Sequence, residues 1–175
     1  SSLLRLISGL IQPTSGNIYV NNLSLESLHV NHYRSQLGLS LSEESPFEGT
    51  IKENITFGDS GITEEDIFWA FEKVGLTPFI KEQPKGLQTI LNPEGKQMSY
   101  TVSKKIILAR AIIKKPKVLI LEDPLDQFNI LETKNIIEFL THPDNPWALL
   151  VVSSNKQWKN HCNQVITLEK GEVKP

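Results

Sequence analysis

The stretch of sequence that decides the fold covers residues 108–123 and reads LARAIIKKPKVLILED. Pro116 separates a helix-forming segment from a run of apolar residues at positions 118–121. A short, uninterrupted apolar run is typical of a strand that is buried on both faces of a parallel sheet. Glu122 and Asp123 follow this run directly. The sequence therefore predicts two carboxylates at the carboxyl end of a strand, the edge at which open α/β sheets bind ligands.

Helices and short apolar strands alternate on either side of this stretch. Residues 101–115 and 130–140 predict helices, and residues 37–41, 149–152 and 165–168 predict further strands. Such alternation indicates an α/β domain with a mainly parallel sheet whose faces are covered by helices.

The first 20 residues and the middle of the chain add shorter elements. Residues 3–7 predict a helix and residues 17–20 a short strand. Thr63 precedes an acidic turn and an apolar stripe, which is the pattern of a helix N-terminus. The mostly helical middle, residues 49–109, is interpreted as an insertion into the α/β lobe.

Composition limits the classes of function. A length of 175 residues fits one globular domain, and a net charge of −2 gives no basic surface for nucleic acid, so no nucleic-acid partner is expected. The single cysteine, Cys162, excludes an intrachain disulfide framework. No apolar run approaches the roughly 20 residues that span a bilayer, so a membrane role would depend on a partner or on flanking sequence.

Five segments, in the right order and spacing, carry a family resemblance. Residues 108–123 resemble the segment that joins the signature helix to the Walker B strand in ABC ATPases. Residues 1–16 are similar to the segment directly after the P-loop lysine, and GTIKENITFG at 49–58 is similar to the exporter-type segment after the Q-loop. Residues 86–99 have the spacing of the approach to the signature motif, and residues 168–173 resemble the closing strand and turn. The sequence is thus identified as a member of the exporter-type ABC nucleotide-binding domains.

The resemblance implies a RecA-like P-loop NTPase lobe with a mainly parallel sheet, formed by residues 1–48 and 110–175. The ABC-type helical subdomain would be residues 49–109. The glycine-rich P-loop and the strand leading into it would precede Ser1, which leaves an expected gap in the sheet. ATP and Mg²⁺ are the expected cofactors of the intact protein, with weak or absent binding by this fragment.

The resemblance also assigns site positions. Ser1 would be the magnesium-binding hydroxyl, and Ser1 with Ser2 would contact the nucleotide. Glu122 takes the position of the Walker B aspartate, a metal ligand, and Asp123 that of the catalytic glutamate. The remaining positions are the Q-loop glutamine, the signature serine, the D-loop aspartate and the switch histidine, which correspond to Ser42, Ser99, Asn129 and Ser154.

Most of these positions depart from the family pattern. Ser42 is too short to reach magnesium and the attacking water. Tyr100 and Thr101 replace the two signature glycines. Glycine has no Cβ, and this permits the signature loop to approach a partner's phosphate closely. Asp123 is one methylene shorter than the family's glutamate, so its carboxylate oxygens are withdrawn by about one ångström. A misplacement of that size can lower the rate about 10²-fold. Ser154 supplies no imidazole. Slow or absent hydrolysis is therefore expected.

Three functions are compatible with the resemblance. The first is an exporter subunit at the cytoplasmic face of a membrane, coupled to a transmembrane domain through residues 42–48 and the helical insertion. A second nucleotide-binding domain would complete its site in a head-to-tail dimer. The alternatives are a regulatory or scaffolding pseudo-ATPase and a soluble ABC ATPase in DNA repair or translation. An intact glycine-rich loop with its lysine before Ser1 would favour a subunit that binds ATP, and a degraded loop would favour the scaffolding pseudo-ATPase. The exporter-type segment GTIKENITFG argues against the soluble ATPase.

Several other residues have structural interpretations. Arg110 is predicted to be a packing or ion-pair residue, and His161 a solvated loop residue. The lysine pairs at 104–105 and 114–115 are predicted to be solvated helix positions. Three tryptophans are predicted to anchor the core or the subdomain: Trp69, Trp147 and Trp158.

Overall fold

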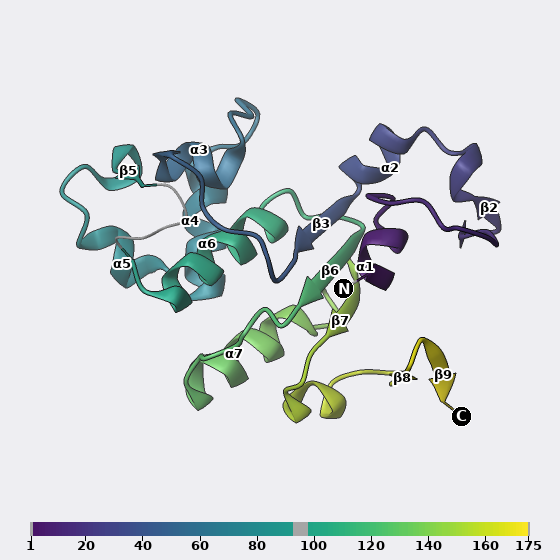
Figure 1. The fold of residues 1–175 in the computed structure, drawn as a ribbon. Helices are drawn as coiled ribbons and strands as arrows, with labels where there is room; N and C mark the ends of the chain where they lie inside the picture. Colours follow the sequence, from purple (N-terminus) through teal and green to yellow (C-terminus); the bar gives the residue numbers. More distant parts are fainter. Residues whose placement is uncertain (1, 93–97, 175) are drawn as a thin grey trace.

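A three-stranded parallel sheet lies at the centre of the computed structural model, which describes residues 2–92 and 98–174 (Figure 1). Its strands are β3 (Leu37–Ser40), β6 (Val118–Glu122) and β7 (Ala148–Val152), in the order β3-β6-β7. Ile120 pairs with Leu39 on one side and with Leu150 on the other. The predicted central strand is confirmed, and it ends at Glu122, one residue later than its apolar run.

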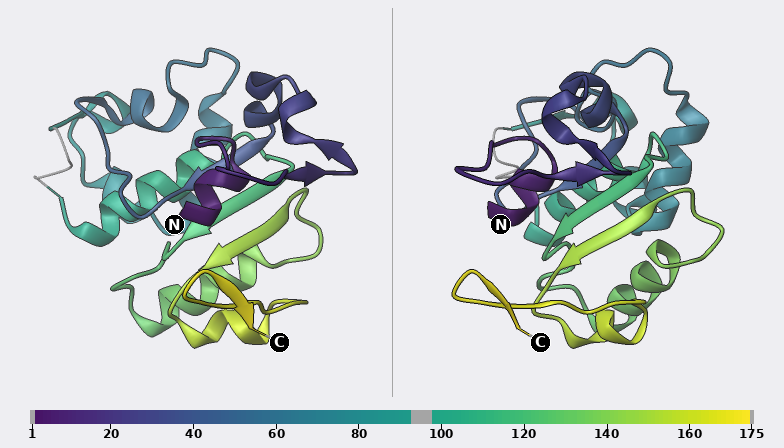
Figure 2. Two further views of the ribbon diagram at one scale, coloured as in Figure 1. Left: turned by 45° about the vertical axis from the view of Figure 1, so that its right-hand side comes forward. Right: turned by 90° about the vertical axis from the view of Figure 1, so that its right-hand side faces the viewer.

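The two faces of β6 pack against different helices, because successive side chains of a strand point to opposite faces. Ile120 packs with Leu4 of α1 (Ser2–Ile7). Leu119 and Leu121 lie in the larger cluster, together with α6 (Tyr100–Ile112) and α7 (Ile130–Leu140). Helices therefore cover both faces of the parallel sheet, as the resemblance to a RecA-like P-loop NTPase lobe implies (Figure 2).

α6 lies unusually close to β3. A Cβ built on Gly38 would lie 2.2 Å from the backbone oxygen of Ala111 and 2.8 Å from Cγ of Pro116. Only glycine permits this approach of the helix to the strand. The same helix is buried almost all round, with Ile106 to Ala109 fully inaccessible to solvent.

The part of the helical middle that precedes α6, with α3 (Ile51–Thr56) and α4 (Glu64–Val74), packs on the far side of that helix (Figure 1). These two helices each begin with a capping box, formed by Thr50 with Glu53 and by Thr63 with Asp66. The N-terminus predicted at Thr63 is thereby confirmed. The remaining elements here are α5 (Thr77–Lys81), a 3-10 turn η2 (Gly86–Gln88) and the antiparallel pair β4 (Gly49–Thr50) and β5 (Ile90–Leu91).

Shorter elements lie at the two ends of the chain. Near the N-terminus these are the antiparallel pair β1 (Tyr19–Val20) and β2 (Leu23–Ser24), a 3-10 turn η1 (Leu25–Ser27) and α2 (Val30–Ser35). Near the C-terminus they are η4 (Lys156–Asn160), β8 (Thr167–Glu169) and β9 (Glu172–Lys174).

The last predicted strand does not join the parallel sheet. Residues 165–168 were expected to complete the alternation, but β8 begins at Thr167 and pairs antiparallel with β9. The two strands form an exposed hairpin that stands apart from β7 (Figure 2). Within the described residues β7 pairs only with β6. The strand itself is confirmed at Thr167 and Leu168, but its place differs, because a short apolar run indicates a strand without indicating its neighbour.

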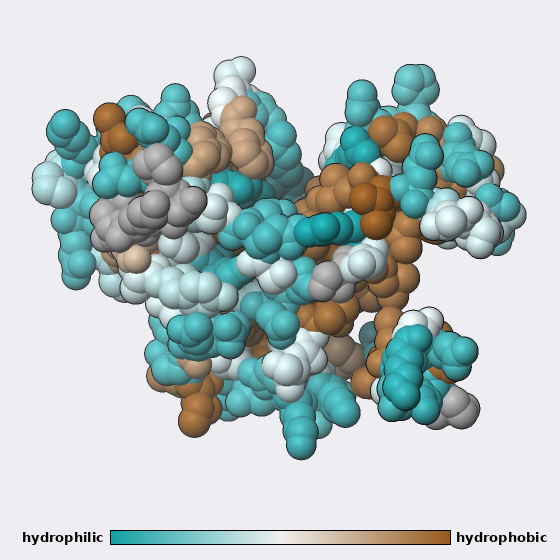
Figure 3. Space-filling model, in the orientation of Figure 1, coloured by the Kyte–Doolittle hydropathy of each residue, from teal (hydrophilic) through white to brown (hydrophobic). Residues whose placement is uncertain are grey.

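Apolar side chains gather on the surface around α1 and the adjoining sheet (Figure 3). Leu3, Leu10 and Ile11 are each more than two-fifths exposed. Among the described residues, no helix is both long enough and apolar enough to cross a bilayer.

Candidate functional site

The carboxyl ends of β3 and β6 bring two predicted positions together. Parallel pairing sets Ser40 beside Leu121, so the residues that follow each strand meet at one edge of the sheet. Ser42 donates from its backbone nitrogen and from Oγ to Oε2 of Glu122, at 3.2 and 3.0 Å. Glu122 is only 5% exposed. The residues predicted to take the Walker B and Q-loop positions are therefore in direct contact.

Asp123 and Ser154 are also neighbours. The backbone nitrogen of Ser154 donates to Oδ1 of Asp123 at 3.1 Å, and the nitrogen of Asp123 donates to the oxygen of Val152 at 2.8 Å. Asp123 adopts a left-handed backbone conformation, with φ 39°. The two positions predicted to be catalytic are thus neighbours. The backbone N–H of one bonds to the side-chain carboxylate of the other.

Ser99 and Asn129 are helix N-caps in this structure. Ser99 Oγ accepts from the backbone nitrogen of Val102 at 3.3 Å, and Asn129 Oδ1 accepts from that of Glu132 at 2.9 Å. Ser2 is an exposed residue of α1. Ser1 lies outside the described residues, as does Gly95 of the segment that leads to the signature motif.

Substitution of Asn129 by alanine should therefore lower the stability of the fold. The change removes the acceptor for the first turn of α7 and is expected to cost about 1 kcal/mol of unfolding free energy. Urea unfolding would measure it, with Asn135→Ala, at an exposed position of the same helix, as the matched control. Equal stability of the two variants would contradict the capping role.

Lys104 is a site residue that the sequence prediction missed. It was expected on a solvated helix face, yet it is 4% exposed, and Nζ donates to the backbone oxygen of Ser42 at 2.8 Å. The neighbouring Lys105 is buried as well and bonds to Glu132 Oε1 at 2.5 Å and to the oxygen of Gly75 at 3.2 Å. The prediction for this pair was wrong because α6 is packed on several sides. The apolar run at 106–109 that follows the pair was the available signal.

The electrostatics of the site follow from this burial. Burial lowers the pKa of the Lys104 ammonium below its ordinary value. Four carboxylates oppose that shift: Glu44, Asp126, Glu122 and Asp123. Burial likewise raises the pKa of Glu44, an effect that Arg110 opposes most strongly. An ammonium is thus held among carboxylates at the end of β6.

Arg110 organises a second surface beside this site. Its Nε donates to the oxygen of Asn54 at 2.7 Å and its Nη2 to Oδ1 of the same residue at 3.2 Å. The guanidinium carbon lies 4.5 Å from the ring centroid of Phe57 and 5.6 Å from that of Phe47. The two rings stack at 5.8 Å and remain exposed, by 65% for Phe57 and 38% for Phe47. The predicted packing role of Arg110 is confirmed.

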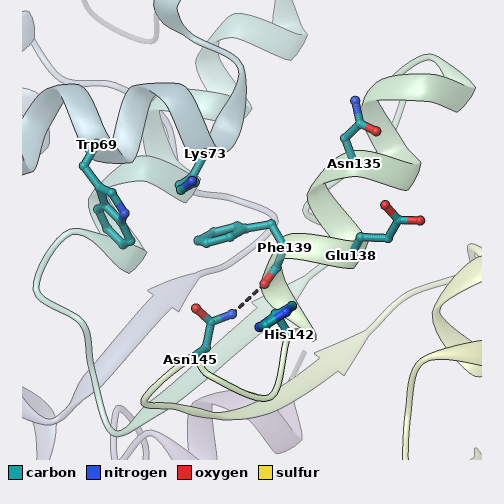
Figure 4. A pocket seen from close by; sticks show the side chains of 7 residues that line it. All are labelled: Trp69, Lys73, Asn135, Glu138, Phe139, His142 and Asn145. Atoms are coloured by element: carbon teal, nitrogen blue, oxygen red, sulfur yellow. Dashed lines mark hydrogen bonds between the residues drawn. The ribbon is translucent and has the colours of Figure 1, made fainter.

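An open pocket of about 540 Å³ lies between α4 and α7, away from the predicted site residues. Figure 4 shows Trp69 and Lys73 on one wall, Phe139 at its base and the amide of Asn145 bonded to the Phe139 oxygen. Its other lining residues are Asn135, Glu138 and His142.

The other tryptophans pack as predicted. Trp147 and Trp158 are buried in the main core, and Trp69 packs against it with its ring 6.1 Å from that of Phe139. His161 is exposed, as predicted.

Comparison with known proteins assigns the family. The family model described as ABC transporter matches residues 1–126. A protein of Arabidopsis thaliana, ABC transporter B family member 15, is 36% identical over 173 residues, or 99% of this chain and 14% of its own length. The uncharacterized ABC transporter ATP-binding protein YfiB of Bacillus subtilis (strain 168) is 29% identical over 173 residues, or 99% of this chain and 30% of its own length.

A solved structure shares the fold. The structure of a bacterial Atm1-family ABC exporter with ATP bound superposes with a TM-score of 0.91 at 18% identity, covering 99% of this chain and 31% of that one. The chain belongs to the ABC transporter family, and the prediction of an exporter-type nucleotide-binding domain is confirmed. It spans under a third of the length of these two curated relatives.

The family implies ATP and Mg²⁺ in general, and the described residues test the fit of the metal. Mg²⁺ requires near-octahedral oxygen ligands, through one or two carboxylates with water and phosphate. Here Oε2 of Glu122 already accepts two hydrogen bonds from Ser42, and the Lys104 ammonium is buried against the same loop. These residues do not fit a resident Mg²⁺.

Proposed function

We propose that this chain is an exporter nucleotide-binding domain that responds to ATP binding while hydrolysing ATP slowly or not at all. One observation carries the proposal: both carboxylates at the end of β6 are engaged by the protein itself, Glu122 by Ser42 and Asp123 by the Ser154 backbone. A general base must instead reach the water that it activates. In the proposed mechanism, the residues of this chain position the nucleotide and the bond-breaking step takes place at a partner's site.

The partner sites are proposed from the same arrangement. We propose that residues 42–48 and the helical region 49–109 contact a transmembrane domain, since Phe47 and Phe57 present exposed aromatic area beside that loop. Aromatic side chains are enriched at the centres of protein interfaces. Ser99, exposed at the start of α6, would face a second nucleotide-binding domain in a head-to-tail dimer. These contacts would place the chain at the cytoplasmic face of the membrane.

A regulatory pseudo-ATPase that never binds ATP is the second candidate, because the engaged carboxylates account for its lack of hydrolysis as well. The two candidates differ in nucleotide affinity. Binding of a fluorescent ATP analogue to the intact protein supports the first candidate, and an absence of binding at saturating nucleotide supports the second.

Steady-state ATP turnover of the intact protein, with no partner added, tests the loss of hydrolysis. We expect turnover at background, and we expect Asp123→Glu to raise it by up to about 10²-fold, because the extra methylene moves the carboxylate outward by about one ångström. Ser154→Ala is the matched control, since it removes the hydroxyl and keeps the backbone N–H that Asp123 accepts. Clear wild-type turnover that Asp123→Asn abolishes would sink the proposal.

A further inference from the structure

Lys104 joins the signature helix to the loop after β3. Its ammonium donates to the backbone oxygen of Ser42, and Ser42 in turn donates twice to Oε2 of Glu122. Three elements far apart in sequence, the start of α6, the loop after β3 and the end of β6, are thus linked by one short chain of hydrogen bonds.

The charge of Lys104 is as important as its hydrogen bond. A buried ammonium is costly unless opposite charges surround it. Four carboxylates from two segments of the chain stabilise its charge: Glu44 after β3, and Glu122, Asp123 and Asp126 at the end of β6. The ring of Tyr100 covers it from its own helix, with Nζ 5.6 Å from the centroid. The negative charge at this edge of the sheet is therefore balanced from within the protein.

We infer that Lys104 is an internal cation that clamps the Ser42 loop to Glu122 and supplies the positive charge that a divalent cation would bring to this edge of the sheet. Nucleotide binding by this chain is accordingly independent of Mg²⁺. The inference rests on the proposed function in that it concerns the nucleotide site of the same domain. It explains why these carboxylates do not fit a resident metal ion: adding a dication beside a buried ammonium would bring like charges together.

Hydrogen exchange tests the clamp on the chain itself. Lys104→Met removes the donor to Ser42 and keeps most of the apolar stem, so amide exchange in residues 41–45 should accelerate about tenfold, because local opening sets exchange rates. Lys105→Met is the matched control, since the adjacent buried lysine bonds to Glu132 and Gly75 instead. It should accelerate exchange near those residues and leave residues 41–45 unchanged. No acceleration in Lys104→Met, or an equal one in Lys105→Met, overturns the clamp.

Binding of Mn²⁺ in the absence of nucleotide tests whether the charge of Lys104 opposes a divalent cation. The electron paramagnetic resonance signal of the free ion measures this binding. The wild-type chain should bind Mn²⁺ at least about tenfold more weakly than Lys104→Met, since one neighbouring like charge shifts an ionic equilibrium by this order. Glu122→Gln added to Lys104→Met should remove the new site. Equal affinity of wild type and Lys104→Met would refute the internal cation. Lys104→Gln repeats the comparison if the methionine variant does not fold.

Binding of ATP by the intact wild-type protein, in excess EDTA and in Mg²⁺, separates the two proposals. Equal affinity in both conditions supports the inference. Binding only with Mg²⁺ overturns it and leaves the proposed function standing. Absence of binding in both conditions overturns the proposed function and, with it, Mg²⁺-independent nucleotide binding, while the exchange and Mn²⁺ results still decide whether Lys104 is a clamp.

Discussion

Alanine at position 38 is expected to destabilise the chain by about 3 kcal/mol, the upper part of the usual range for overpacking a core. The added Cβ would lie 2.2 Å from the backbone oxygen of Ala111 and 2.9 Å from Cδ1 of Leu119. Relief requires α6 to move away from β3, because a backbone oxygen cannot rotate aside as a side chain can. Urea unfolding of Gly38→Ala would measure the loss.

Gly61→Ala provides the matched control for this substitution. A Cβ at Gly61 meets only the flexible carboxylate of Asp59, at 3.2 Å, and the backbone bond from Gly61 to that carboxylate is retained. The control should stay within about 0.5 kcal/mol of wild type, as ordinary surface changes do. Similar stabilities of the two variants would mean that α6 and β3 are not in close contact at Gly38.

Arg110→Ala is expected to cost about 2–4 kcal/mol of unfolding free energy. The substitution removes two hydrogen bonds from a charged donor to Asn54, a buried residue, and the contact of the guanidinium with Phe57. Bonds to charged groups contribute about 1.5–3 kcal/mol, and a cation over an aromatic ring about 0.5–2 kcal/mol. The loop that carries Phe47 should loosen as well, because Asn54 also bonds to its backbone nitrogen and oxygen.

Arg110→Lys distinguishes charge from shape in that prediction. Lysine keeps the positive charge and loses the planar fork that bonds Asn54 twice while stacking on Phe57. We expect it to recover less than half of the lost stability. Full recovery in urea unfolding would show that charge alone, opposite Glu44, holds this surface together.

The fold could largely be predicted from the chain because its decisive signals are local. The apolar run before Glu122 and the capping pattern at Thr63 each determine a strand or a helix without reference to distant residues. The partner of each strand is a long-range property, which is why the strand predicted at residues 165–168 was expected in the parallel sheet, whereas β8 pairs with β9 in a hairpin. Local signals identify elements, and tertiary packing selects their neighbours.

The candidate site was predictable only in part, for a related reason. Family resemblance located Ser42, Glu122, Asp123 and Ser154, and the structure pairs them two by two. Lys104 escaped prediction because a lysine on a helix is usually solvated, and only the packing of α6 against the sheet and the loop buries it. A polar residue next to a fully apolar helical run is the pattern to examine in such chains.

The burial of α6 determines how cooperatively the molecule unfolds. One continuous apolar cluster extends from Ile51 in α3, through Ile106, to Leu121 in the sheet. A helix shared by two regions gives neither of them a separate core to retain. We therefore expect the helical region and the sheet to unfold together in a single transition, because they share α6. A destabilising change in either region should weaken both.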